Sequence, residues 1–150
     1  MIKFIIDLPP RPKERPRFSK RSGHAYTPRA TRQYEERAAV KAREVMAGRP
    51  PIPKGTPLRI RVLAVFEVPK SWSQKRRKAA IQGCMRHTTK PDFDNSVKSV
   101  CDAFNGIVYA DDSQICSSQI DKVYGETACL KFFIEEIPLY ATPEVHSLWS

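Results

Sequence analysis

The apolar residues of this chain fall into short runs, and none of these runs is longer than one β-strand. Alternating apolar side chains predict four strands, at 2–8, 58–68, 114–124 and 128–137. Helical spacing predicts helices at 31–46 and 94–105, and a short basic helix that begins after Ser71 or Ser73. Strands and helices that alternate in this order along 150 residues predict a single α+β domain, residues 1–150, with a mixed sheet.

Glycine and proline residues in the last third of the chain predict a turn and a tail. Gly125-Glu126 separates the last two strand patterns, so we expect these two strands to form a hairpin. Pro138 and Pro143 follow the last strand. We therefore expect a core of about 1–137 and a loose tail at 138–150.

The four cysteines have neither the spacing of a zinc site nor that of a disulfide framework. We expect them to be reduced. Cys101 falls in a helix pattern, and Cys116 and Cys129 fall in strand patterns, so we expect small buried side chains at these positions.

Charge is divided unevenly along the chain. Residues 1–90 carry 23 basic and 6 acidic side chains, a net of +17, whereas residues 91–150 carry 3 and 10, a net of −7. The basic part favours a polyanionic partner, most simply nucleic acid. No run reaches the ~20 apolar residues that span a bilayer, and Met1 is not followed by a secretory leader. We therefore expect a cytoplasmic protein with no membrane partner.

Basic side chains are concentrated in a proline-rich segment, residues 11–29, where the prolines exclude a regular helix. In an extended segment, alternating basic residues can all face one row of phosphates. Phe18 and Tyr26 are expected either to stack on bases or to anchor the segment to the core. The alternative for the basic residues is a solvated loop or a charged helix face. The residues expected to contact DNA are Lys13, Arg15, Arg17, Lys20, Arg21, Arg29, Arg76, Arg77 and Lys90.

Aspartates in two neighbouring segments form the candidate chemical site. In K-P-D-F-D-N-S-V-K, residues 90–98, Asp92 and Asp94 can face the same side. Asp111-Asp112 follows shortly before a strand. If the two segments converge, their carboxylates make the oxygen site that Mg²⁺ prefers, because Mg²⁺ keeps waters and substrate phosphate oxygens as further ligands. Lys98, one helical turn after Asp94, is able to orient a water or stabilise the phosphate.

Each of these aspartates also has an ordinary structural explanation as a helix cap or a turn residue. Acidic residues beside a basic surface would repel phosphate unless a cation screens them. The residues alone therefore leave two hypotheses open, a metal-dependent nuclease and a nucleic-acid-binding module without catalysis. His87, five residues before Asp92, is expected to contact phosphate or to make a loop hydrogen bond rather than to bind the metal.

Three motifs resemble the RusA family of Holliday junction resolvases. They are K-P-D-x-D-N-x-x-K at 90–98, D-A-x-N-G at 102–106 and D-D-x-Q-I at 111–115. K-E-R-P-R-F at 13–18 and A-Y-T-P at 25–28 resemble the phage and prophage branch of that family, so the resemblance covers about residues 9–125.

The resemblance implies a homodimeric, Mg²⁺-dependent endodeoxyribonuclease, with Mn²⁺ able to substitute. Such an enzyme resolves four-way DNA junctions in recombination and repair, by attack of metal-activated water on the phosphodiester. The resemblance assigns metal binding to Asp92, Asp94 and Asp112, with Asp111 as a neighbour that shares the load, and catalysis to these three aspartates and Lys98. Ser96 and Phe104 stand where leucine is common in the family. A nuclease for other branched or flapped DNA is the alternative within the same class.

Overall fold

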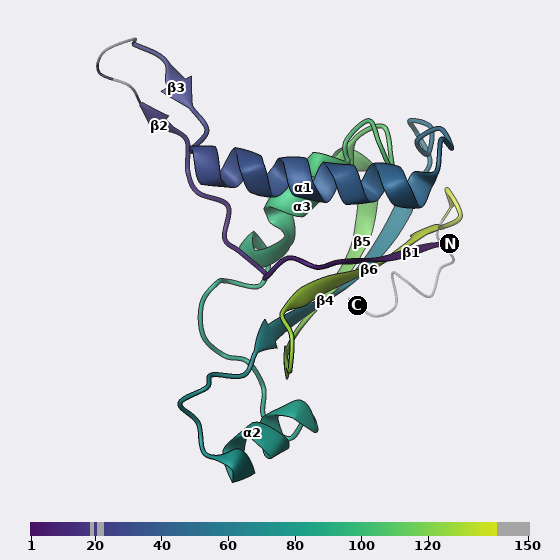
Figure 1. Ribbon diagram of the computed structural model, residues 1–150. Helices are drawn as coiled ribbons and strands as arrows, with labels where there is room; N and C mark the ends of the chain where they lie inside the picture. The colour runs from purple at the N-terminus through teal and green to yellow at the C-terminus, as the bar shows by residue number, and fades with distance from the viewer. Residues whose placement is uncertain (19, 21–22, 141–150) are drawn as a thin grey trace, which may run out of the picture.

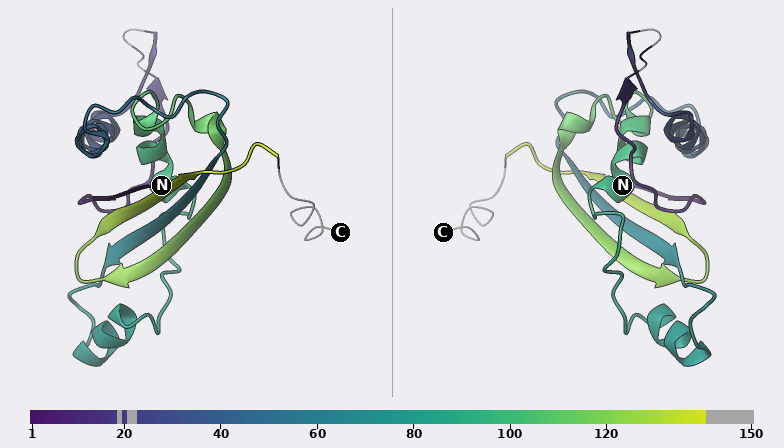
Figure 2. Two further views of the ribbon diagram at one scale, coloured as in Figure 1. Left: turned by 90° about the vertical axis from the view of Figure 1, so that its right-hand side faces the viewer. Right: turned by 90° about the vertical axis from the view of Figure 1, so that its left-hand side faces the viewer.

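A mixed four-stranded sheet, covered on one face by two helices, forms the body of the protein (Figures 1 and 2). The computed structural model describes residues 1–18, 20 and 23–140. The strands are β1 (Ile2–Ile6), β4 (Leu58–Glu67), β5 (Ile115–Gly125) and β6 (Cys129–Glu136), and the covering helices are α1 (Arg29–Met46) and α3 (Asn95–Phe104). The predicted α+β class and mixed sheet are confirmed. Arg21 and residues 141–150 of the expected tail lie outside the described residues.

The strand order in the sheet is β1-β6-β4-β5. β4 pairs in parallel with β5 and antiparallel with β6, so that Val62 lies between Ile120 and Phe132. The predicted hairpin of β5 and β6 is therefore wrong, because β4 separates these two strands. The reason is burial. The inward side chains of β4 are nearly all fully buried, as suits a central strand, whereas β5 stays partly exposed along its length, as suits an edge.

An aromatic cluster joins α3 to the sheet. The ring centroid of Phe104 lies 4.9 Å from that of Phe4 and 5.1 Å from that of Phe132. The Tyr109 hydroxyl donates a hydrogen bond of 2.8 Å to the carbonyl of Cys101 within the same cluster. α1 packs beside α3 and buries one stripe at helical spacing, formed by Tyr34, Ala38, Ala42 and Met46.

Other local predictions have mixed outcomes. Ser73 caps the basic helix by accepting a hydrogen bond from the Arg76 amide, as one of the two predicted starts requires. All four cysteines are free thiols, but Cys116 is exposed rather than buried because it lies on the edge strand β5. No helix within the described ranges is long and apolar enough to cross a membrane.

Two segments project from the layered body in opposite directions, with the start of α3 between them (Figures 1 and 2). One is a small hairpin of β2 (Arg17–Phe18) and β3 (Ala25–Tyr26), within the segment expected to be an irregular loop. The other comprises residues 69–90 and contains α2 (Gln74–Ile81); we call it the basic arm. A short 3₁₀ turn, η1 (Asp112–Gln114), precedes β5.

Phe104→Ala is expected to lower the free energy of unfolding by about 3–5 kcal/mol, because it leaves a cavity among Phe4, Phe132 and Tyr109. Urea denaturation followed by circular dichroism measures this change. Ile5→Ala is the control, since Ile5 is 46% exposed on the other face of β1, and it should cost no more than about 1 kcal/mol. Equal, small losses in both variants would contradict the assignment of Phe104 to the core.

Candidate functional site

The acidic motif lies at the beginning of α3. Asp94 occupies the N-cap position but makes no side-chain capping hydrogen bond, and the carboxylates of Asp92 and Asp94 are exposed. The backbone carbonyls of these two residues instead accept the first hydrogen bonds of the helix, from the amides of Ser96 and Lys98. The buried Ser96 hydroxyl donates to the Phe93 carbonyl at 2.6 Å. The backbone carbonyls thus complete the start of the helix, and neither carboxylate is used to cap it.

Asp92, Asp94, Asn95 and Lys98 line one cavity of about 360 Å³ with Lys13 and Arg15 of the N-terminal basic segment. The structure therefore brings together two of the expected metal ligands, the expected catalytic lysine and two of the expected DNA-binding cations. Lys90 lies beside this cavity, in an adjoining hollow with Asp92 and Asn95.

Asp111 and Asp112 lie near the other end of α3. The Asp111 carboxylate accepts a hydrogen bond of 2.9 Å from the Ser113 amide, and the Gln114 side chain accepts one from the Asp111 amide. The hydrogen bond from Ser113 lowers the pKa of Asp111. Asp111 thus caps a turn, as the structural alternative in the sequence analysis predicted.

Asp112 lies close to the C-terminal half of α3. Burial, together with the charges of Asp102 and Asp112, raises the pKa of the Cys101 thiol to about 12. A helix rises ~1.5 Å per residue, so the eight residues from Asp94 to Asp102 span about 12 Å. Within the described part of this chain, no three His, Cys, Asp or Glu side chains are grouped so as to hold a metal ion. The described residues of a single chain thus show no grouping of both aspartate pairs, and their convergence on one metal ion stays a prediction.

Asp92 and Asp94 remain the residues that fit a divalent cation. Both are exposed carboxylates on one cavity, which the neighbouring Asn95 also lines. Mg²⁺ in proteins is commonly held by one or two carboxylates while waters and substrate phosphates complete its octahedron. Two protein carboxylates on an open cavity are compatible with that arrangement.

Lys13, expected to contact DNA, is engaged within the protein. Its ammonium forms ion pairs with Asp102 and with Glu35, the latter at 3.1 Å, and its backbone amide donates to the Asn95 side chain at 3.2 Å. Burial alone would lower the pKa of Lys13, but the hydrogen bonds and charges of Asp102 and Glu35 outweigh it and raise that pKa. Lys13 therefore attaches the basic segment to α1 and α3. The sequence analysis did not identify Glu35, Asn95 or Asp102 as its partners, because no local spacing connects them.

The other expected DNA-binding residues differ in their surroundings. Arg17 pairs with Glu14 at 3.2 Å. Arg76 stacks on the Trp72 ring at 3.7 Å, and Arg77 donates to the carbonyls of Val68 and Pro69. Arg77 is half-buried, whereas the exposed residues of this set are Arg15, Arg17, Lys20, Arg29, Arg76 and Lys90. Phe18 and Tyr26 are also exposed, at 68% and 49%, so the expectation that they anchor the segment in the core is wrong.

Lys122 on β5 is a functional candidate that the sequence analysis missed. Its ammonium donates to the carbonyl of Thr89 at 2.5 Å and to that of Pro91 at 2.7 Å. It thereby holds the backbone that leads directly into Asp92. Alternation along β5 places Lys122 on the helix-covered face of the sheet, where a lysine is unusual, and that was the only available sequence signal.

His87 belongs to the basic arm and packs against β4 rather than at the acidic motif. Its ring stacks on Phe66 with a centroid separation of 3.8 Å, and its Nε2 lies 3.4 Å from the Thr89 hydroxyl. Burial and the charge of Lys122 lower the pKa of His87. The predicted loop hydrogen bond is thus present.

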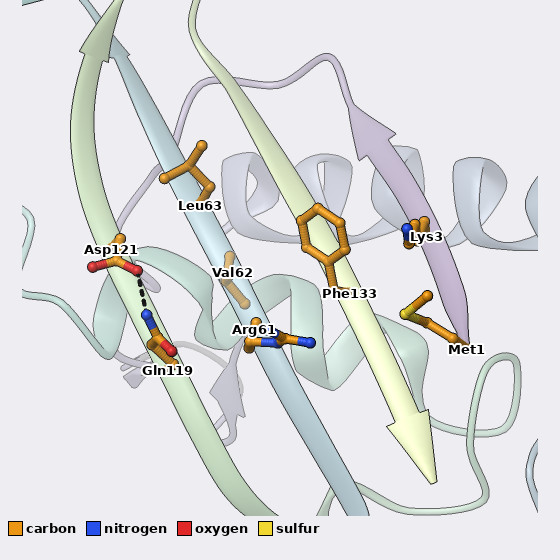
Figure 3. A pocket seen from close by; sticks show the side chains of 8 residues that line it. All are labelled: Met1, Lys3, Arg61, Val62, Leu63, Gln119, Asp121 and Phe133. Atoms are coloured by element: carbon orange, nitrogen blue, oxygen red, sulfur yellow. Dashed lines mark hydrogen bonds between the residues drawn. The ribbon is translucent and has the colours of Figure 1, made fainter. Parts of the chain in front are cut away.

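A larger hollow, of about 480 Å³, lies on the sheet face that α1 and α3 leave uncovered (Figure 3). Lys3, Arg61, Leu63 and Phe133 are among the residues that line it. Its one carboxylate, Asp121, accepts a hydrogen bond of 2.8 Å from Gln119. None of the residues expected to bind metal or DNA lies there, so this hollow is not the candidate site.

The family model described as endodeoxyribonuclease RusA matches residues 7–135. The chain belongs to the RusA endodeoxyribonuclease family. The match includes the basic segment, the acidic motif at the start of α3 and η1, and so confirms the family that the sequence motifs indicated.

The chain is also similar to the uncharacterised protein YqaN of Bacillus subtilis strain 168. The two are 35% identical over 140 residues, which cover 91% of this chain and 96% of the relative. The similarity therefore extends over most of both chains.

Lys122→Met is expected to loosen the start of α3. Hydrogen bonds to a charged group contribute roughly 1.5–3 kcal/mol, so the amides of Ser96 and Lys98 should exchange with solvent at least about tenfold faster. Hydrogen exchange with mass spectrometry measures this. Lys131→Met, on β6 of the same sheet, is the control. Unchanged exchange at these amides in Lys122→Met would show that Lys122 does not hold the motif.

Proposed function

We propose that this protein is a Mg²⁺-dependent, structure-specific endonuclease that resolves four-way DNA junctions. Membership of the RusA family supports nuclease activity and a role in recombination. The observation that carries the proposal is the shared cavity of Asp92, Asp94 and Lys98, beside basic side chains that can receive phosphate. Two exposed carboxylates that cap no helix would repel phosphate from the basic surface around them. A DNA-binding module without catalysis would gain nothing from such carboxylates.

In this proposal Asp92 and Asp94 would hold the metal ion at the cavity that they line. When bound, Mg²⁺ would neutralise charge on the phosphate and strengthen a water molecule as nucleophile. The Lys98 ammonium, on the same cavity, stabilises negative charge that develops on the phosphate oxygens. Arg15 binds a neighbouring phosphate, and Lys13 positions this segment over α3 through its ion pairs.

A four-way junction has two-fold symmetry, and a homodimer presents two equivalent cavities to it. We therefore propose that the active form is a homodimer that cuts paired strands. Asp112, which the resemblance assigns to the metal, lies by the C-terminal half of α3, and its substitution tests whether it contributes to the metal site.

The first test is cleavage of a synthetic four-way junction with Mg²⁺ or with a chelator, beside a flapped duplex and a linear duplex. We expect symmetric nicks on the junction only, with Mg²⁺ and also with Mn²⁺. Preferred cutting of the flap would favour the alternative nuclease. Tight junction binding without cleavage in either metal would favour the non-catalytic binding module.

Asp92→Asn and Asp94→Asn are expected to reduce cleavage at least about 100-fold while junction affinity is retained. The reason is that loss of a metal ligand removes several kcal/mol of transition-state stabilisation. Single-turnover cleavage and gel-shift titration measure the two effects separately. Asp111→Asn is the matched control, since asparagine can still accept the hydrogen bond from Ser113, and it should keep most of its activity.

Asp112→Asn then decides the remaining assignment. A loss equal to that of Asp92→Asn would indicate that Asp112 reaches the metal in the assembled enzyme. Activity close to that of the unsubstituted protein would restrict the metal site to the start of α3. Loss of folding or of DNA binding in Asp92→Asn would contradict a purely metal-binding role for that residue.

A further inference from the structure

We propose that the basic arm is a clamp for duplex DNA, which grips the backbone of a junction arm next to the acidic cavity. This inference rests on the proposed function and adds to it a second DNA-binding element. The element differs in position and in construction from the N-terminal basic segment.

The charge of the arm is the first observation. Its residues include Lys70, Lys75, Arg76, Arg77, Lys78, Arg86 and Lys90, and they include no aspartate or glutamate. None of the ion pairs in the described part of the chain involves an arm residue. Like charges brought together in this way repel each other unless an anionic partner neutralises them. The described residues supply no such partner.

The position of α2 is the second observation. The helix lies beyond the ends of β4 and β5, away from α1 and α3 (Figures 1 and 2). Ala80 is its only buried residue. An isolated helix of this length is marginal in water. Since only Ala80 is buried, α2 also contributes little to the hydrophobic core. Its sequence, Q-K-R-R-K-A-A-I, has no apolar stripe, which argues against a membrane surface as the partner.

The base of the arm is fixed to the body. The ring centroids of Trp72 and Tyr124 lie 5.1 Å apart, and His87 stacks on Phe66. Arg76 and Arg77 contribute to the same attachment, through the Trp72 ring and through the carbonyls of Val68 and Pro69. These contacts hold the arm in one orientation before binding, which reduces the entropy lost when DNA binds.

This division of roles leaves the solvent-facing cations for DNA. Lys70, Lys75, Lys78, Arg86 and Lys90 are all exposed. Lys75 and Lys78 are three residues apart, so they are neighbours on one side of α2. Lysine acts as a flexible point charge, which suits phosphate contacts without base recognition.

The arm also leads directly to the acidic cavity. Its last residue, Lys90, lies in a hollow with Asp92 and Asn95. Lys122 fixes the carbonyls on both sides of Lys90, those of Thr89 and Pro91. A DNA backbone held along the arm would therefore continue toward Asp92 and Asp94. Phosphate contacts fix the register of a duplex, so the clamp would position the phosphodiester for cleavage.

The test compares the triple variant Lys75→Ala, Lys78→Ala and Arg86→Ala with a charge-matched control, Lys3→Ala, Arg37→Ala and Arg43→Ala. The control residues are exposed and lie outside both the arm and the cavity. Alanine is the best helix former, so α2 should be retained. Junction binding is measured over a range of salt concentrations. A plot of log Kobs against log salt has a negative slope, and each lost phosphate contact makes it less steep by ~0.9. We therefore expect the magnitude of the slope to decrease by about 2–3 for the arm variant and by less than about 1 for the control.

Junction length locates the contact. Each protein is tested on junctions whose arms are shorter than one helical turn and on junctions whose arms span two turns. The unsubstituted protein should gain affinity from the longer arms, and the arm variant should lose this gain. Its single-turnover cleavage at saturating concentration should stay within about twofold of the original, because the cavity is intact.

Two results would overturn the clamp alone. One is a salt slope equal to that of the control while the unsubstituted protein still cleaves junctions. The other is the same loss of affinity on short-armed and long-armed junctions. Failure of the unsubstituted protein to bind or cleave any branched DNA would overturn the proposed function and the clamp together. If circular dichroism shows that α2 is lost, the pair Lys70→Gln and Lys90→Gln, outside α2, takes the place of the triple variant with an expected slope decrease of about 1–2.

Discussion

Phe104 packs against Phe4 and Phe132 of the sheet, and this contact determines where α3 lies. A helix fixed at its C-terminal end by an aromatic cluster can direct its N-terminal end only within a narrow range. Asp92 and Asp94 precede that N-terminal end, so their position follows from packing in the core. Asp92 and Asp94 therefore need no strong local preference for a particular backbone conformation to reach this position.

Two lysines complete the support of this position. Lys13 ties the N-terminal basic segment to Asp102 on α3, and Lys122 ties the end of the basic arm to β5. Both are cations in a basic chain, yet both are used inside the protein. Lys13 and Lys122 therefore orient the acidic motif, and other basic side chains are left to attract phosphate.

The hairpin of β2 and β3 and the basic arm project in opposite directions from the layered body, with the start of α3 between them (Figure 1). The proposed DNA path runs between these two projections, across the cavity of Asp92 and Asp94. Their construction differs. The hairpin presents the exposed rings of Phe18 and Tyr26, whereas the arm presents lysines on a base held by stacked rings. Such a surface offers aromatic contacts on one side of the cavity and backbone contacts on the other.

The sequence by itself determined the family, the α+β class, the helices and the acidic motif, because periodicity and motif spacing are local properties. It did not determine the neighbours of β4, since β5 and β6 have the spacing of a hairpin and burial decides which strand becomes central. It also did not show that Lys13 and Arg77 have partners inside the protein, or that Lys122 holds the motif. Tertiary structure decided that Asp112 lies by the C-terminal half of α3 while Asp92 and Asp94 lie at its start, because a helix has a fixed rise per residue and its packing places its two ends.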